Sequence, residues 1–294
     1  MIAVVGQPGA WSTERLAGAL RAAGADALVV DLAACTLRLP EPGVWHRGRR
    51  LDVEAVVVKK IGDTAGGWTV RERLQILRHW QASGVPVWSA PERLEPAVDR
   101  YRMTVELVRA GLPVPETVVT EDVDEAMAAV ERFGAAVLKP LFTSKGRGMQ
   151  RLDSSLDVPR ILERHRADGA GPWYLQRLVR HPGRDLGVAV LDGRCLGAYW
   201  RIAGEGQWMT TVLSGGRYAP ADPPAEALAL AEHAAQHFGL LFTGVDLIEG
   251  DEGFTVLEVS AFGGFRGLLD GCGIDAAPLM ADAVLTRCRA AGVS

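Results

Sequence analysis

Lysine is scarce in this chain of 294 residues. Its 32 basic residues include only four lysines, and the others are all arginines. The lysines are Lys59, Lys60, Lys139 and Lys145. Such a bias is typical of genome composition, so a lysine kept beside a glycine-rich stretch indicates a specific role. Lys139 and Lys145 satisfy that description.

Cysteine pairs and long apolar runs are also missing. The four cysteines are scattered without a CxxC pair, which argues against a disulfide framework or a zinc site. No uninterrupted apolar stretch reaches the roughly 18–20 residues that a membrane helix needs. The first apolar run, Ile2–Val5, follows no basic segment. We therefore interpret it as a strand, and expect a cytoplasmic protein with no membrane partner.

Charge of one sign is not concentrated in any part of the chain. The net charge is −4, and acidic and basic residues are mixed. Without a basic stripe, nucleic acid is not expected as a partner. Apolar residues make up 48% and charged residues 23%, the ordinary balance of a soluble globular protein.

The N-terminal third alternates apolar runs with helical patterns. Runs without alternation, separated by helices, indicate a parallel sheet that is covered on both faces. We predict strands over 2–6, 27–32 and 53–58, and a helix over 12–23 with Ser12 or Thr13 as its N-cap. The fold class is α/β with α+β portions, and residues 1–97 form its first domain.

Two further units follow, over 98–179 and 180–294. In the second unit, strands at 116–120, 135–140 and 173–179 flank helices and a glycine-rich loop. The third unit is rich in strands, which we predict at 184–191, 194–203, 208–213, 243–248 and 254–259. Helices at 223–238 and 275–290 complete it.

A lysine at the end of an apolar strand precedes the glycine-rich loop. Lys139 is followed by the loop residues Thr143, Ser144, Lys145, Gly146, Arg147 and Gly148. Glycines let backbone N–H groups approach phosphate oxygens, and a lysine neutralises their charge. The loop is not a Walker A motif, because GxxxxGK[ST] is absent. Taken alone, the motif is explained better as a surface turn with a solvated lysine.

Two carboxylates lie within apolar strand patterns. Asp246 and Glu258 are each flanked by valine, leucine or isoleucine on strands that form a hairpin. Two buried carboxylates would repel unless a cation lay between them, and their hard oxygens suit Mg²⁺. The alternative is that both point to solvent. A third segment, Gln176-Arg177-Leu178-Val179 with Asp185 beyond it, could present backbone groups to an adenine edge.

The order of these parts resembles the ATP-grasp ligases, and within them the RimK-like branch, over roughly residues 90–285. Asp99-Arg100 with Pro113-Val114-Pro115 is similar to the family's opening motif. Gly244-Val245-Asp246 and Leu257-Glu258-Val259-Ser260 are similar to its metal motifs. The stretch 263–268 is similar to a sub-branch that is linked to tetrahydromethanopterin and methylofuran one-carbon pathways.

The resemblance implies a pre-ATP-grasp domain followed by a two-lobed ATP-grasp fold. It also implies ATP and Mg²⁺ as cofactors, with Mn²⁺ as an alternative metal. The partners would be a small-molecule or peptide carboxylate and an amine such as glutamate, joined through an acyl phosphate. A homodimer remains open.

Residue roles follow from the same resemblance. Asp246, Glu258 and Ser260 would hold the metal, and Arg201 would stabilise the acyl phosphate. Lys145 would close the loop over the phosphates, while Gly9 and Arg266 would meet the acceptor substrate. The nucleotide would contact Arg100, Lys139, Ser144, Gly146, Arg147, Gly148, Gln176, Arg177, Leu178, Val179 and Asp185.

Several positions depart from the family pattern. Arg100 replaces a lysine, Gly187 and Ser214 replace arginines, and Ser260 replaces an asparagine. These departures support an alternative, a degenerate ATP-grasp protein that binds a ligand without turnover. A dehydrogenase is a third interpretation, but the loop after the first strand lacks GxGxxG.

Overall fold

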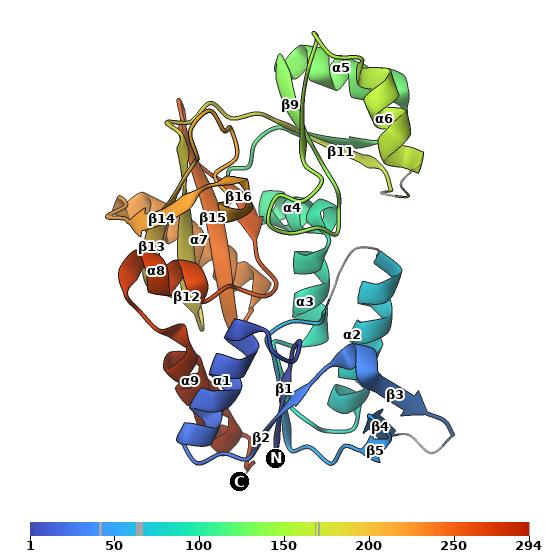
Figure 1. Ribbon diagram of the computed structural model, residues 1–294, viewed down its shortest axis with the longest axis vertical. Coiled ribbons are helices and arrows are strands. Elements are labelled where there is room, and N and C mark those ends of the chain that lie inside the picture. The colour runs from blue at the N-terminus through green and yellow to red at the C-terminus, as the bar shows by residue number, and fades with distance from the viewer. Residues whose placement is uncertain (41–42, 63–66, 168, 170, 294) are drawn as a thin grey trace.

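The computed structural model describes residues 1–40, 43–62, 67–167, 169 and 171–293 (Figure 1). An N-terminal α/β part lies at the bottom of the view, beside both chain termini. A large lobe lies above it on the left, and a small lobe stands at the top. Among the described residues, no helix is long and apolar enough to cross a membrane.

The N-terminal sheet is parallel, as the apolar runs predict. Its strands run in the order β2-β1-β6-β7. They are β1 (Ile2–Val5), β2 (Ala27–Val30), β6 (Ala55–Val58) and β7 (Val87–Trp88). Helix α2 (Gly67–Ala82) packs on one face, and α1 (Trp11–Ala22) on the other. The C-terminal helix α9 (Ala276–Ala290) lies against α1, so the two ends of the chain meet there.

The start of α1 differs from the prediction. The helix begins at Trp11 with Ala10 as its N-cap, and no side chain caps it. Instead, Glu14 accepts a hydrogen bond of 2.8 Å from the backbone N–H of Gly9. Thr13 is buried beneath Gly6, where a Cβ would lie 2.5 Å from the threonine hydroxyl. The predicted cap at Ser12 or Thr13 is therefore wrong.

A small antiparallel sheet is inserted between β2 and β6, and two helices lead out of the N-terminal part. The sheet consists of β3 (Cys35–Arg38), β4 (Gly43–His46) and β5 (Arg49–Arg50), which we had not predicted. The helices are α3 (Pro91–Val98) and α4 (Arg100–Arg109). Asp99 caps α4 by accepting from the N–H groups of Tyr101 and Arg102.

The small lobe is a four-stranded antiparallel sheet with both of its helices on one face. Its order is β10-β9-β11-β8. These are β8 (Thr117–Thr120), β9 (Ala135–Lys139), β10 (Gln150–Asp153) and β11 (Trp173–Arg177), with α5 (Val123–Phe133) and α6 (Val158–Ala167). Ala136 and Leu138 pack against the helices. Because side chains alternate along a strand, Lys139 points to the opposite face.

The large lobe is built on a five-stranded antiparallel sheet in the order β14-β13-β12-β15-β16. Its strands are β12 (Arg184–Leu191), β13 (Arg194–Ile202), β14 (Arg217–Pro220), β15 (Phe242–Gly250) and β16 (Gly253–Val259). Helix α7 (Ala225–Phe238) packs on one face against Leu186, Val188 and Leu247. Helix α8 (Arg266–Cys272) lies against β13 and β14.

The predicted strand over 208–213 is wrong. That segment is a loop followed by the 3-10 helix η2 (Val212–Ser214), and the edge strand β14 comes later. Gly216 explains the compact turn, because a Cβ there would lie only 2.3 Å from the carbonyl oxygen of Thr210. Only a residue without a side chain lets the backbone pass so closely.

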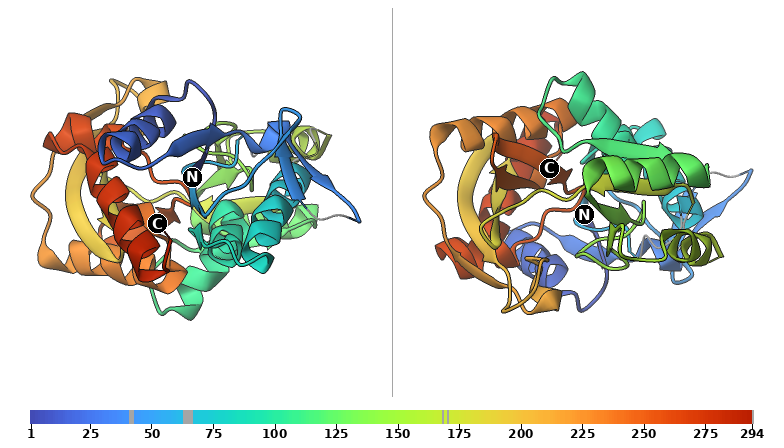
Figure 2. Two further views of the ribbon diagram at one scale, coloured as in Figure 1. Left: turned by 90° about the horizontal axis from the view of Figure 1, so that it is seen from below. Right: turned by 90° about the horizontal axis from the view of Figure 1, so that it is seen from above.

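The hydrophobic cores separate the small lobe from the rest. One core runs from the N-terminal sheet through α3 and α4 into the large lobe. The small lobe has a core of its own, built from α5, α6 and their sheet. Figure 2 shows the small lobe, in green, beside the yellow-to-red large lobe from two further directions. Each of the four sheets lies within one of the ranges 1–97, 98–179 and 180–294, and the division into these three domains remains a prediction.

Candidate active site

Charged side chains gather on one face of the large-lobe sheet, opposite α7. In the strand register, Asp185 pairs with Arg201, Gly187 with Asp246, and Asp246 with Glu258. Directly paired residues of antiparallel strands point to the same face. Leu186 and Val188 alternate with these positions and enter the core beneath α7. The register therefore brings together residues up to 73 positions apart in a sequence of 294.

A β-bulge turns Glu258 toward this face. The register shifts next to Asp246, so that Asp246 faces Glu258 while Leu247 faces Val256. Leu257 is the extra residue. Val256 can thus enter the core while Glu258, two positions later, still points to the open face. Bulges commonly redirect side chains in this way beside active sites.

Arg201 joins two of the carboxylates. Its Nε and Nη2 donate to the two oxygens of Asp185 at 2.8 and 2.6 Å. Its Nη1 lies 2.8 Å from Oδ2 of Asp246. Burial raises the pKa of Asp246; the charge of Arg201 lowers it, and the charges of Asp185 and Glu258 raise it further. Arg201 is therefore the cation that offsets the charges of Asp185 and Asp246.

Arg100 connects the small-lobe loop to the third carboxylate. Its side chain is only 4% exposed, and its Nη1 lies 3.1 Å from Oε2 of Glu258. Its Nε donates to the carbonyl of Pro140 at 3.2 Å, and its Nη2 to that of Thr143 at 3.1 Å. One guanidinium thus binds the start of the glycine-rich loop and a carboxylate of the large lobe.

Lys139, at the end of β9, lies close enough to Arg100, Glu258 and Asp246 to feel their charges. Its Nζ donates to Oε1 of Gln176 at 2.5 Å, and the amide of Gln176 donates in turn to the hydroxyl of Tyr174 at 3.1 Å. That hydroxyl lies 2.7 Å from Thr104 Oγ1. Burial lowers the pKa of Lys139 to about 7; Arg100 lowers it as well, and Glu258 and Asp246 oppose the shift. An anionic ligand would stabilise its charged form.

The glycine-rich loop reaches toward the large lobe. Lys145 has a left-handed backbone with φ of 61°, and its side chain and that of Arg147 are exposed. Arg147 Nε donates to the carbonyl of Ser144 at 3.3 Å. A Cβ on Gly146 would lie 3.2 Å from Thr211 of the large lobe. Gly148 completes the loop with φ of 72°.

Comparison with known proteins identifies this arrangement. A sequence model of the RimK-like ATP-grasp domain matches residues 97–284. The chain belongs to the RimK-like ATP-grasp family. This membership confirms the predicted family and fold, and with them the class of ATP-dependent ligases.

Named relatives match nearly the whole chain. A tetrahydromethanopterin:alpha-L-glutamate ligase of Methanosarcina acetivorans is 31% identical, over 92% of this chain and 94% of that protein. A probable alpha-L-glutamate ligase of Stenotrophomonas maltophilia is 26% identical, over 91% of each. The structure of the ATP-grasp ligase PsnB with a minimal precursor, Mg and ADP has a TM-score of 0.71 at 25% identity, and covers 98% of both chains.

The predicted adenine segment has a second role in this ATP-grasp fold. Gln176 is buried and holds Lys139, while Arg177 pairs with Glu116 at 2.5 Å. Strand β11 ends at Arg177, two residues earlier than predicted. Leu178 and Val179 therefore lie in the connection to β12, where the N–H of Leu178 donates to Ala135 at 3.0 Å. Adenine binding by this segment remains a prediction.

Arg266 lies against the start of α1, just after Gly9, at the junction between the N-terminal part and the large lobe. The guanidinium of Arg266 lies 4.0 Å from the ring of Trp11, two residues after Gly9. Arg266 is 52% exposed and approaches Asp270 at 3.9 Å. Ser260 follows β16, and its N–H donates to Gly244 at 2.8 Å, next to the carboxylates.

Two facing carboxylates suit a metal ion whose remaining coordination positions are filled by substrate phosphates and water. Among the described residues, no group of three or more His, Cys, Asp or Glu side chains could hold a metal ion. Mg²⁺ is commonly bound through one or two carboxylates and substrate phosphates, and it keeps several waters. Asp246 and Glu258, side by side across β15 and β16, fit that pattern.

Sequence reasoning missed a buried lysine beside this region. Lys59, at the end of β6, donates to the carbonyl of Gly263 and lies 4.4 Å from the ring of Phe265. Burial, with the charge of Lys60, lowers the pKa of Lys59 to about 7. It ties the N-terminal sheet to the turn before α8. The scarcity of lysine could have identified it.

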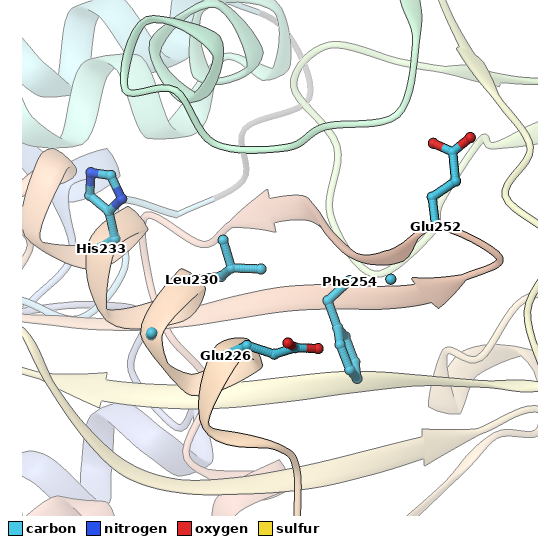
Figure 3. Close-up of a pocket in the computed structure, with 7 residues that line it drawn as sticks. Glu226, Leu230, His233, Glu252 and Phe254 are labelled. Carbon is cyan, nitrogen blue, oxygen red and sulfur yellow. The ribbon is translucent and has the colours of Figure 1, made fainter.

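A hollow of about 430 Å³ lies elsewhere, between α7 and the β15–β16 turn (Figure 3). Its lining includes Glu226, His233, Glu252 and Phe254. Leu186 and Val188 place α7 on the face of the sheet opposite the charged cluster. None of the predicted site residues lines this hollow, so it is not the candidate active site.

Proposed function

We propose that this chain joins a carboxylate to the amine of an amino acid, with α-L-glutamate as the first candidate, through an acyl phosphate. The observation that carries the proposal is the position of Arg100. Its guanidinium contacts both the glycine-rich loop and Glu258. The loop proposed to bind phosphate therefore lies next to a carboxylate proposed to bind the metal. The glutamate ligase names of two relatives support the choice of amine.

The reaction has two steps. A carboxylate oxygen of the acid attacks the γ-phosphorus of ATP, and the bond from that phosphorus to the ADP oxygen breaks. The amine nitrogen then attacks the acyl carbon, phosphate leaves, and the nitrogen gives up a proton. Such chemistry depends mainly on positioning and charge neutralisation.

The chain offers a group for each requirement. Asp246 and Glu258, with Ser260, would hold Mg²⁺, which neutralises phosphate oxygens when bound. Lys139 and Arg100 would bind phosphates, and Gln176–Val179 the adenine. Arg201, oriented by Asp185, would neutralise the acyl phosphate, while Lys145 and Arg147 would close the loop and exclude water.

The ion pairs of the two carboxylates have a consequence for nucleotide binding. Glu258 is paired with Arg100, and Asp246 with Arg201. A cation that binds these carboxylates competes with both guanidinium groups. The phosphates that arrive with it supply new anionic partners, so the arginines can exchange carboxylate for phosphate without losing charge compensation.

The assay for this proposal measures ADP release and amide formation together. With Mg-ATP, a panel of small acids and acidic peptides, and glutamate, we expect ADP release that needs both substrates. Mass spectrometry should detect an amide that is heavier than the acid by one glutamate residue. ATP binding without amide, and without substrate-stimulated ADP release, would instead support a degenerate ATP-grasp protein.

We propose that Arg266 binds the carboxylate of the acceptor acid beside Gly9. Arg266→Ala should raise the KM for the acid about tenfold, with little change in the KM for ATP, because a hydrogen bond to a charged group contributes about 1.5–3 kcal/mol. Steady-state kinetics with the acid varied checks this. The control is Arg289→Ala, an exposed arginine of α9 that bonds Thr286. An unchanged KM for the acid would remove Arg266 from the site.

A further inference from the structure

Tyr199 fits into a slot made by three glycines. Its side chain lies so close to Gly187, Gly267 and Gly271 that a Cβ on each would lie 2.6, 2.3 and 2.4 Å from the nearest tyrosine atom. Gly187 lies on β12, and the other two on α8. Real Cβ atoms do not approach neighbours so closely, so the ring can occupy this place only while all three positions lack side chains.

The slot aims the phenol at the charged cluster. Tyr199 pairs with Gly187 across β13 and β12, and Gly187 pairs with Asp246 across β12 and β15. The three positions form one row on the face that also carries Arg201. The hydroxyl oxygen lies 3.0 Å from where a Cβ on Gly187 would stand. It therefore fills space that a side chain at position 187 would use.

The hydroxyl keeps its proton and has no partner in the part of the chain that the structure describes. Burial raises the pKa of Tyr199, as does the charge of Asp246, while Arg201 opposes the shift. No described residue forms a hydrogen bond with this hydroxyl, although Tyr199 is only 8% exposed. An O–H group held there is free to donate to a ligand oxygen.

We propose that Tyr199 is a catalytic residue whose hydroxyl donates a hydrogen bond to an oxygen of the transferring phosphoryl or acyl phosphate group. The assignment rests on the proposed function. It also explains a departure from the family pattern, in which Gly187 stands at a position expected to carry arginine. The neutral hydroxyl of Tyr199 then takes the place of the arginine expected at position 187, and Arg201 beside it supplies the positive charge.

Tyr199→Phe tests this with the ring kept in its slot. The reaction is run with hydroxylamine, which traps an acyl phosphate as a hydroxamate. We expect kcat for hydroxamate formation to fall about 100-fold, the usual loss on removing one donor to a developing oxyanion. The KM for ATP and the melting temperature should stay unchanged. Tyr101→Phe, on the exposed side of α4, is the control.

The outcomes separate a packing role for the Tyr199 ring from hydrogen-bond donation by its hydroxyl. A Tyr199→Phe enzyme with wild-type kcat overturns the role of the hydroxyl and leaves the ligase proposal standing. A wild-type enzyme that forms neither hydroxamate nor amide with any acid overturns both. A lower melting temperature together with an unchanged kcat would mean that Tyr199 only fills space.

Gly187→Ala provides an independent test of the slot. Its new Cβ would meet the ring of Tyr199 at 2.6 Å and displace the hydroxyl. We expect its kcat to fall about as far as that of Tyr199→Phe. Because both changes remove the same contact, the double variant should be little worse than either single variant. Fully additive losses would contradict the proposal.

Discussion

Asp246→Asn and Glu258→Gln should each lower kcat/KM for ATP by more than about 100-fold. Changing groups that merely orient a metal's ligands already costs about 10–100-fold, and a direct ligand should cost more. Both changes keep shape and hydrogen-bonding capacity but remove a negative charge from the charged face of the large-lobe sheet. Arg201 would keep both of its bonds to Asp185, so Asp246→Asn should remain folded. ADP release at saturating acid and amine measures the loss.

A matched control lies on the same hairpin. Glu249 is half exposed on β15 and approaches Arg184 only at 3.8 Å. Glu249→Gln removes one carboxylate from the same strand and should leave ADP release within about twofold, since exposed pairs contribute little. Raising the Mg²⁺ concentration should partly restore Asp246→Asn, but not a variant damaged by misfolding. Wild-type turnover in both site variants would show that the metal assignment is wrong.

The sequence allowed the parallel sheet and the order of the chemical parts to be predicted. Unalternated runs such as Ile2–Val5 and Ala55–Val58 are strands buried on both faces, and they can hardly form anything else. Lys139 and Asp246 could be identified because a charged residue within an apolar strand needs a reason to be there. These signals are local, so periodicity and composition reveal them.

Other features depend on contacts that no local pattern carries. Arg100 pairs with Glu258 across 158 positions, and an arginine next to a helix cap gives no sign of that partner. The bulge at Leu257 decides which face Glu258 meets, although strand alternation alone would place it with Val256. In the sequence, Gly187 is noticed only because it replaces an arginine of the family pattern. That it leaves room for the ring of Tyr199 becomes evident only from the pairing of β12 with β13.

Arg201→Met should cost both activity and stability, and the stability loss should depend on pH. Arg201 is the cation paired with Asp185, which is 5% exposed, and with Asp246. Removing one partner from a buried pair costs about 3–5 kcal/mol, and we expect about 3 kcal/mol at pH 8 because Asp246 is 21% exposed. ADP release should fall to background, since no other cation pairs with Asp246 among the described residues.

The direction in which pH changes the stability loss follows from the pKa of Asp246 in the folded and unfolded states. In the unfolded chain this carboxyl titrates near ~3.9, whereas burial raises the folded-state pKa of Asp246, and without Arg201 it rises further. Between the unfolded-state pKa and the raised folded-state pKa of Asp246, folded Arg201→Met binds more protons than its unfolded chain. The stability of this variant therefore falls as pH rises. The deficit against wild type should therefore be largest at pH 8 and shrink toward pH 5. Urea unfolding at several pH values measures it. Arg184→Met, on the opposite face of β12 and half exposed, should show a loss below about 1 kcal/mol with little pH dependence. A deficit that grew toward pH 5 would mean that Arg201 does not neutralise these carboxyls.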